Sequence, residues 1–188
     1  MSDSWPIFGP PVRGRACGAC KACCTWVPVE NPLHKPAGTT CVHLRSKGCG
    51  IYDQRPDVCR YWNCAWLYQD ATRAMRRPDL AGYLIDPMMQ TVMAEGHPMP
   101  IVQVWVDPDR PDAHRDPALR DYLDGVGRRY RVPALIRWAW PKPQEGAESM
   151  LLIPPSLRAD GQWLEQRQAM ITHERMSELL AAAGHPRA

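Results

Sequence analysis

Three stretches in the second half of the chain have the hydrophobic pattern of β-strands. Residues 99–106 (MPIVQVWV) alternate, so that the valines at the even positions share one face of an extended segment. Residues 134–140 (ALIRWAW) and 150–153 (MLLI) are short apolar runs, and their length is more typical of strands than of helices. The pattern therefore predicts strands at all three places.

Two longer segments show the spacing of amphipathic helices. Asp116 is a suitable N-cap and Pro117 suits a first helical position, which predicts a helix beginning there. Apolar residues then recur every three or four positions: Leu119, Tyr122, Leu123, Val126 and Tyr130. A second helix is predicted from about Met170 to Ala183, with Gly184 as the residue that ends it.

A shorter helix is predicted closer to the N-terminus, where Asp53 could serve as N-cap and Pro56 would fall in the first turn. This helix would carry Cys59 and lead toward Cys64. Helices and strands are mixed along the chain, and the turns between them are rich in proline. We therefore expect an α+β fold, with a small cysteine-rich, metal-bound module packed on an antiparallel sheet with helices on one side.

The cysteines are confined to the first third of the chain. All eight lie in one window: Cys17, Cys20, Cys23, Cys24, Cys41, Cys49, Cys59 and Cys64. This asymmetry divides the 188 residues into three predicted parts. They are an irregular N-terminal arm (1–16), a cysteine-cluster metal-binding module (17–64) and an α+β body that packs on the module (65–188).

The compartment decides between the two main uses of clustered cysteines. The N-terminus has no basic stretch followed by an apolar run and a cleavage site, so we recognise no secretory signal. No apolar run approaches the roughly 18–20 residues that span a bilayer. We therefore expect a cytoplasmic protein with no membrane partner, in which thiols stay reduced. This favours metal binding over a disulfide framework, which stays the alternative.

Thiolates are preferred ligands of zinc and iron, and a C-x2-C pair can grip one ion from a tight turn. Cys17 and Cys20 have this spacing, as do Cys20 and Cys23, and Cys24 follows directly. Eight thiols suit two four-thiolate zinc sites, or one iron–sulfur cluster and one zinc. Because each short turn supplies few thiols, we expect early and late cysteines to share sites.

Some alternatives for single residues stay open. His34 and His43 lie among the cysteines and could replace a thiolate. One or two cysteines, with Cys24 and Cys49 the first candidates, could instead be small buried apolar residues.

Charge is consistent with an anionic site. The whole chain carries only +3, but residues 13–64 hold eight basic and three acidic residues. Eight thiolates with two divalent ions would be net negative, and this basic surplus would nearly neutralise them. Arg55 and Arg60 could donate hydrogen bonds to thiolates, and Trp62 and Trp66 could shield the site from water. A nucleic-acid patch is disfavoured, because no aromatic-basic motif of an RNA-binding fold accompanies the charge.

The cysteine motifs follow one another in a distinctive order. They are Cys17-x2-Cys20-x2-Cys23-Cys24, Cys41, Gly48-Cys49-Gly50-Ile51-Tyr52, and Arg55-Pro56-x2-Cys59-Arg60-x3-Cys64. This order resembles the YkgJ-type cysteine-cluster family, described as a zinc- or iron-chelating domain with a CxxCxxCC signature. The resemblance covers about the first third of the chain, and it implies metal binding without naming the metal.

The sequence favours a metal-chelating protein that binds zinc or iron, including an iron–sulfur cluster, through all eight cysteines. The cluster would be structural or would serve metal handling. One alternative is an iron–sulfur oxidoreductase or protein-modifying enzyme, and another is a zinc-stabilised interaction module with a protein partner. No nucleophile–base pair, phosphate loop or carboxylate pair demands an enzyme, so we lean away from one.

Overall fold

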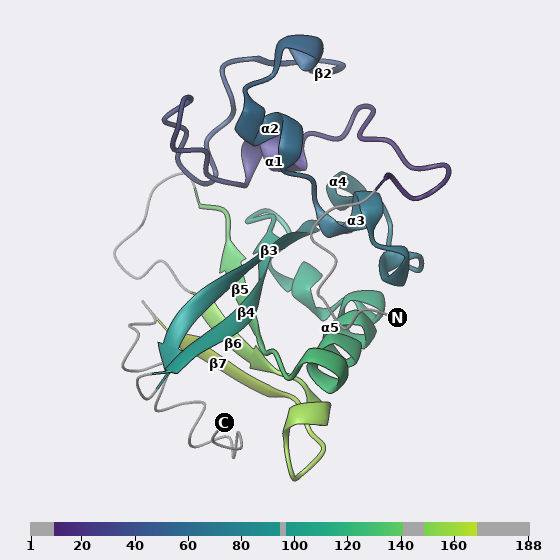
Figure 1. Cartoon of the computed structure of the whole chain (residues 1–188), viewed down its shortest axis with the longest axis vertical. Coiled ribbons are helices and arrows are strands. Elements are labelled where there is room, and N and C mark those ends of the chain that lie inside the picture. Colours follow the sequence, from purple (N-terminus) through teal and green to yellow (C-terminus); the bar gives the residue numbers. More distant parts are fainter. Residues whose placement is uncertain (1–9, 95–96, 141–148, 169–188) are drawn as a thin grey trace.

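The computed structural model describes residues 10–94, 97–140 and 149–168 (Figure 1). Within them, a five-stranded sheet has the order β3-β4-β5-β6-β7. Its strands are β3 (Tyr83–Ala94), β4 (His97–Val106), β5 (Ala134–Trp138), β6 (Ser149–Ile153) and β7 (Leu164–Gln168). The strands predicted at 99–106, 134–140 and 150–153 are thus confirmed, and the helix predicted at 170–183 lies outside the described residues.

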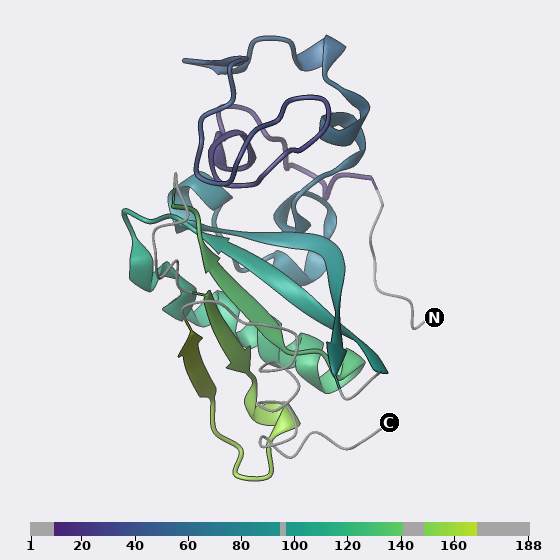
Figure 2. The same ribbon diagram turned by 90° about the vertical axis from the view of Figure 1, so that its left-hand side faces the viewer.

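The sheet is mixed. Neighbouring strands are antiparallel except β4 and β5, which run parallel. These two strands are connected by α5 (Pro117–Tyr130), which returns the chain to the end of the sheet where β4 began, so that β5 runs in the same direction as β4. The predicted α+β class is confirmed (Figure 2), while the antiparallel sheet we expected contains this one parallel pair.

The main core lies between α5 and one face of the sheet. Val102, Val104 and Val106 are completely buried there, which confirms the prediction that these valines share one face of the strand. The helix begins as predicted, since Asp116 accepts a hydrogen bond from a first-turn amide and Pro117 follows it. Its apolar stripe packs on the valines: Leu119, Tyr122, Leu123 and Val126, with Tyr130 partly buried beside them.

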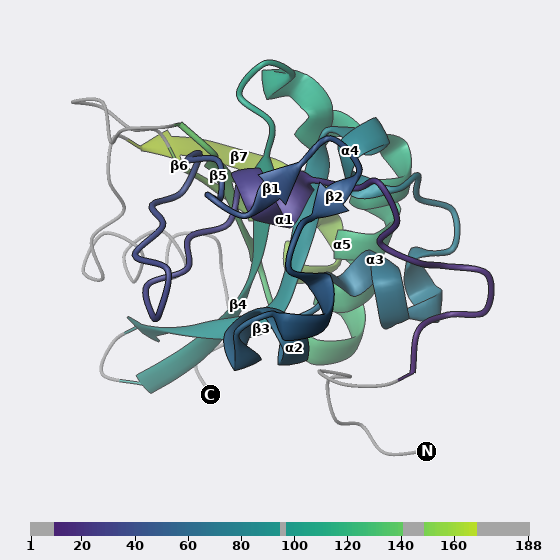
Figure 3. The same cartoon turned by 90° about the horizontal axis from the view of Figure 1, so that it is seen from above.

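Residues 10–64 lie at one end of the sheet and form only short elements (Figures 1 and 3). These are α1 (Ala22–Thr25), the antiparallel pair β1 (Leu44–Arg45) and β2 (Gly48–Cys49), the 3-10 turn η1 (Tyr52–Gln54) and α2 (Asp57–Tyr61). The other short helices are α3 (Ala65–Tyr68), η2 (Asp70–Thr72), α4 (Pro78–Ala81), η3 (Pro111–Arg115) and η4 (Pro155–Leu157).

The helix that carries Cys59 begins later than predicted. Arg55 precedes a proline, which disfavours helical backbone, and its ψ is 143°. The 3-10 turn therefore ends at Gln54, and α2 starts at Asp57 with Pro56 as its N-cap. The prediction that Asp53 caps this helix was wrong.

Two sets of contacts hold the N-terminal segment on the rest of the protein. The first is an apolar cluster of Ala22, Trp26 and Val27 with Leu84, Trp105 and Ala139. The second is Arg15, which donates to the carbonyl of Trp66, to Oγ1 of Thr72 at 2.7 Å and to the carbonyl of Thr72 at 2.9 Å. Its guanidinium also lies 4.8 Å from the centre of the Trp66 ring. The boundary at residue 64 stays a prediction, and these contacts cross it.

Arg15→Lys is expected to lower the free energy of unfolding by about 1–2 kcal/mol, because lysine keeps the charge but loses the forked hydrogen bonds and the stacking. Arg13→Lys is the matched control, since Arg13 is exposed two residues away. Urea unfolding measures both. Equal and small changes in the two variants would show that Arg15 does not fasten this segment.

Candidate metal centre

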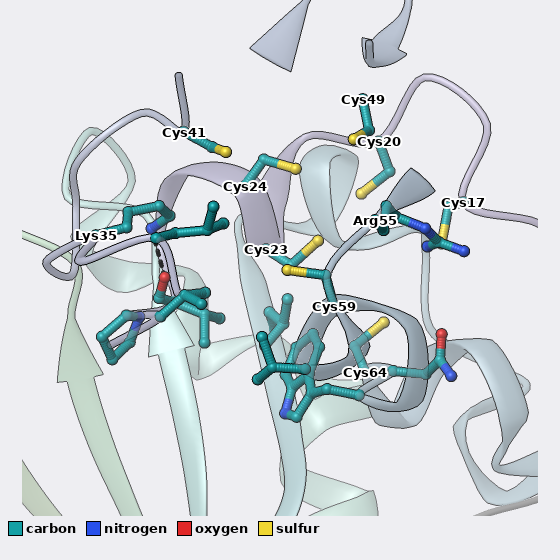
Figure 4. Close-up of a pocket in the computed structure, with 18 of the residues that line it drawn as sticks. Cys17, Cys20, Cys23, Cys24, Lys35, Cys41, Cys49, Arg55, Cys59 and Cys64 are labelled. Atoms are coloured by element: carbon teal, nitrogen blue, oxygen red, sulfur yellow. Dashed lines mark hydrogen bonds between the residues drawn. The ribbon is translucent and has the colours of Figure 1, made fainter. Parts of the chain in front are cut away.

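All eight cysteines line one cavity of about 830 Å³. Figure 4 shows their thiols converging from segments far apart in sequence, with Lys35 on the Cys41 side and Arg55 beside Cys17. Each cysteine is partly exposed and is a free thiol. The sequence predicted this gathering, and the structure places all eight candidate ligands around the same space.

The first four cysteines are brought together by a turn and a single helical turn. The amide of Cys20 donates to the carbonyl of Cys17 at 2.9 Å, and Gly18 has a φ of +52°, a conformation that glycine adopts easily. Cys23 and Cys24 then lie on α1, the segment whose Ala22 packs on the sheet. The cluster is thereby anchored to the core at its N-terminal end.

The remaining four are positioned by hydrogen bonds of the backbone. The amide of Cys41 donates to the carbonyl of Cys24 at 2.9 Å, which fixes these two residues side by side. Cys49 ends β2, and Cys59 lies on α2. Cys64 is the N-cap of α3, so the fold holds it next to the sheet.

The thiols are gathered but do not form a finished coordination shell. Among the described residues, no group of three or more His, Cys, Asp or Glu side chains is arranged to hold a metal ion. Metal binding in this cavity therefore requires the thiols to close in on the ion. His43 lines the cavity and remains a candidate ligand by position, whereas His34 does not line it.

The charges of the thiolates act on one another in two neighbourhoods. Burial, together with Cys17 and Cys20, raises the pKa of Cys64 to about 12. Burial also raises the pKa of Cys59, and the thiolates that add to this shift belong to a different set: Cys24, Cys41 and Cys49.

Cys23 and Cys24 join the two neighbourhoods. A hydrogen bond between their sulfurs raises the pKa of Cys23 and lowers that of Cys24 to about 7. Cys64 and Cys17 further raise the pKa of Cys23. Cys23 is thus linked to Cys17 and Cys64, and Cys24 to Cys59, but the neighbourhoods overlap, since Cys24 also raises the pKa of Cys17.

Two cations face the thiols. Lys35 is buried, and its ammonium donates to the carbonyls of Val27, Pro36 and Thr25, the last two at 3.3 and 3.4 Å. Burial lowers the pKa of Lys35, while four thiolates of the cluster raise it. Lys35 was one of the eight basic residues expected to neutralise the thiolates, but nothing in the sequence predicts that it is buried.

The second cation is Arg55, which was predicted from the sequence to interact with thiolates. Its guanidinium stacks 3.7 Å from the centre of the Tyr52 ring, and it lowers the pKa of Cys17 and of Cys24. Arg60 instead donates to the carbonyl of Asp53 at 3.2 Å and does not line the cavity.

Tryptophans and the sheet close the cavity on the other side. Trp62 and Trp66 line it as expected, and Nε1 of Trp62 donates to Oδ1 of Asp86 at 3.1 Å. The sheet adds lining residues that the sequence did not suggest: Leu84, Asp86, Gln103, Trp105 and Arg137.

The comparisons with known proteins add nothing to the evidence from the cysteine motifs. No helix among the described residues is both long and apolar enough to cross a membrane. The resemblance to the YkgJ-type family rests on the cysteine motifs and stays a prediction. No protein-family model, curated protein or solved structure matches the chain.

Proposed function

We propose that this chain is a metal-binding protein that holds zinc, or iron including an iron–sulfur cluster, through its eight cysteines. The observation that carries the proposal is the convergence of all eight thiols on one cavity. Soft thiolates are ligands for these metals, and a core of ordinary packing has no need to gather so many of them. In a reducing compartment such as the cytoplasm the thiols would stay available to the metal.

The surroundings fit an anionic metal–thiolate centre. Lys35 and Arg55 supply positive charge at two places on the cavity wall. Trp62 and Trp66 supply apolar cover. A buried negative centre needs both, because desolvated charge is costly without nearby countercharge.

We further propose how the ligands divide. Cys17, Cys20, Cys23 and Cys64 form one set of four, and Cys24, Cys41, Cys49 and Cys59 form the other. Each set combines early and late cysteines, so a bound metal ties distant parts of the segment together. The cluster is then a structural element, and its binding free energy is folding free energy for residues 17–64.

Elemental analysis of protein purified without oxygen tests this proposal. We expect two zinc equivalents per chain, or iron with acid-labile sulfide and a brown colour. The thiols should resist alkylation until a chelator is added. Metal content near zero in freshly prepared, reduced protein would end the proposal, as would four disulfides in protein taken directly from its native compartment.

A second candidate is the iron–sulfur enzyme, and one observation favours it. The cavity does not stop at the thiols but continues onto the sheet, past Trp105 to Arg137. A purely structural metal site has no use for such space. The brown, iron-containing form would support this candidate, and a colourless zinc form would exclude it.

A further inference from the structure

The sheet end of the cavity is built from three adjacent strands. Leu84 on β3 lies opposite Trp105 on β4, and Trp105 pairs in turn with Arg137 on β5. Asp86 and Gln103 pair two residues along from the first pair. Side chains two residues apart share a face, so these five form one continuous surface under the thiols.

This surface carries a buried donor with no acceptor. Trp105 is 7% exposed, and its indole Nε1–H has no hydrogen-bond partner among the described residues. A buried donor left without a partner destabilises a protein, so native structures seldom contain one without a reason. The acceptor missing here is one that a bound molecule can bring.

Beside this donor lies a cation that pairs with no carboxylate of the described residues. Arg137 is exposed, and its guanidinium stacks 5.7 Å from the centre of the Trp105 ring. The nearest acid on this surface by register, Asp86, already accepts the hydrogen bond of Trp62.

Metal does not account for this part of the cavity. Zinc lies about 2.3 Å from each thiolate sulfur, so it occupies only the space between its ligands. The whole cavity has a volume of about 830 Å³, within the range of about 300–1,000 Å³ typical of small-molecule pockets. Room for an organic molecule is therefore left beside the thiols.

We infer that the sheet end of the cavity binds a small organic anion with an apolar portion. Arg137 pairs with the anionic group, Nε1–H of Trp105 donates to one of its oxygens, and the apolar portion lies against Leu84 and Trp62. Guanidinium forks match the oxygens of carboxylates and of phosphates alike. Asp86 on the same surface disfavours a second negative charge, so a monocarboxylate is the preferred ligand. The inference does not depend on which metal the cysteines bind.

Calorimetric titration of the full chain, purified without oxygen, tests this with three probes of similar size. Benzoate is expected to bind, phenyl phosphate more weakly, and neutral benzamide at least about tenfold more weakly than benzoate, since it lacks the charge that Arg137 recognises. Tighter binding of phenyl phosphate than of benzoate would support an anion site and would assign its ligand to the phosphate esters rather than the carboxylates.

Variants assign the contacts. Arg137→Gln should lower the affinity for benzoate at least about tenfold. Trp105→Phe keeps an aromatic ring but removes the N–H, and it should lower this affinity by about three- to tenfold. Arg167→Gln is the matched control, because Arg167 also stacks on a strand tryptophan, Trp138, but lies outside the cavity. It should bind benzoate as the unmodified protein does.

The metal content of each variant is measured in parallel, so that failure of this site is distinguished from failure of the cysteine cluster. Absence of binding by both anionic probes overturns the inference. So does equal binding of benzamide and benzoate, or unchanged affinity in Arg137→Gln. Because Arg137 is exposed, its replacement is expected to leave the fold intact, and this last result is then decisive whatever Trp105→Phe does to stability.

Discussion

Cys59→Ser is expected to release metal from the set that contains it and to unfold residues 17–64. Cys59 is the thiol whose pKa responds to Cys24, Cys41 and Cys49 together, so its position is central to that set. A structural zinc site contributes on the order of 10 kcal/mol to folding. The segment has few other means of stability, since its buried apolar residues are Ala22, Trp26 and Val27.

The body should survive this change in part, because the core between α5 and β4 makes no use of Cys59. Far-UV circular dichroism should therefore retain strand and helix signal, while the emission of Trp62 and Trp66 moves to that of exposed indoles. Val58→Ser is the matched control, as it places the same residue one position earlier on α2 at an exposed site. A Cys59→Ser protein with unchanged metal content and thermal midpoint would show that Cys59 is not a ligand.

Gly38→Ala is expected to lower the free energy of unfolding by about 4 kcal/mol or more, at the upper end of single substitutions. A Cβ at this position would clash with the carbonyl of Ala139 and lie 2.5 Å from the carbonyl carbon of Trp140. These are backbone atoms at the end of β5 and cannot rotate away. Gly38 also has a φ of +68°, which adds about 1–2 kcal/mol for a residue with a Cβ.

Gly161→Ala separates the two causes. Gly161 has a φ of +63°, but a Cβ there would meet nothing within 4 Å, so this variant carries the backbone strain without the clash. Urea unfolding should give a difference of several kcal/mol between the two alanine variants. Similar losses in both would mean that the N-terminal segment can move away from β5 at little cost.

The fold could be predicted from sequence where one face of an element is buried and the other is not. α5 meets this condition and was predicted with its buried face, whereas β4 is buried on both faces and was predicted from the alternation of its valines. β3 was missed because Pro87 interrupts it and its register shifts between Asp86 and Gln90, an irregularity tolerated at an edge strand. β7 was missed because LEQRQ, at the other edge, has almost no apolar residues.

The site was predictable as far as its chemistry is local. The spacing of the cysteines was enough to predict that their thiols lie around one site. Arg137 and Trp105 could not be assigned to the same cavity, because only the parallel pairing of β4 with β5 brings them together. Nor could the burial of Lys35 be foreseen, since it depends on carbonyls at the end of α1.

The docking of the cysteine segment on β3, β4 and the end of β5 has a consequence for biosynthesis. The thiols leave the ribosome first, and the last part of their support, Ala139, is translated 75 residues after Cys64. At about 5–20 residues per second, this delay lasts about 4–15 seconds. Until it ends, the nascent chain carries eight thiols without the complete surface on which they dock. Under the proposed function, metal could therefore reach these thiols while the chain is still tethered and unfinished.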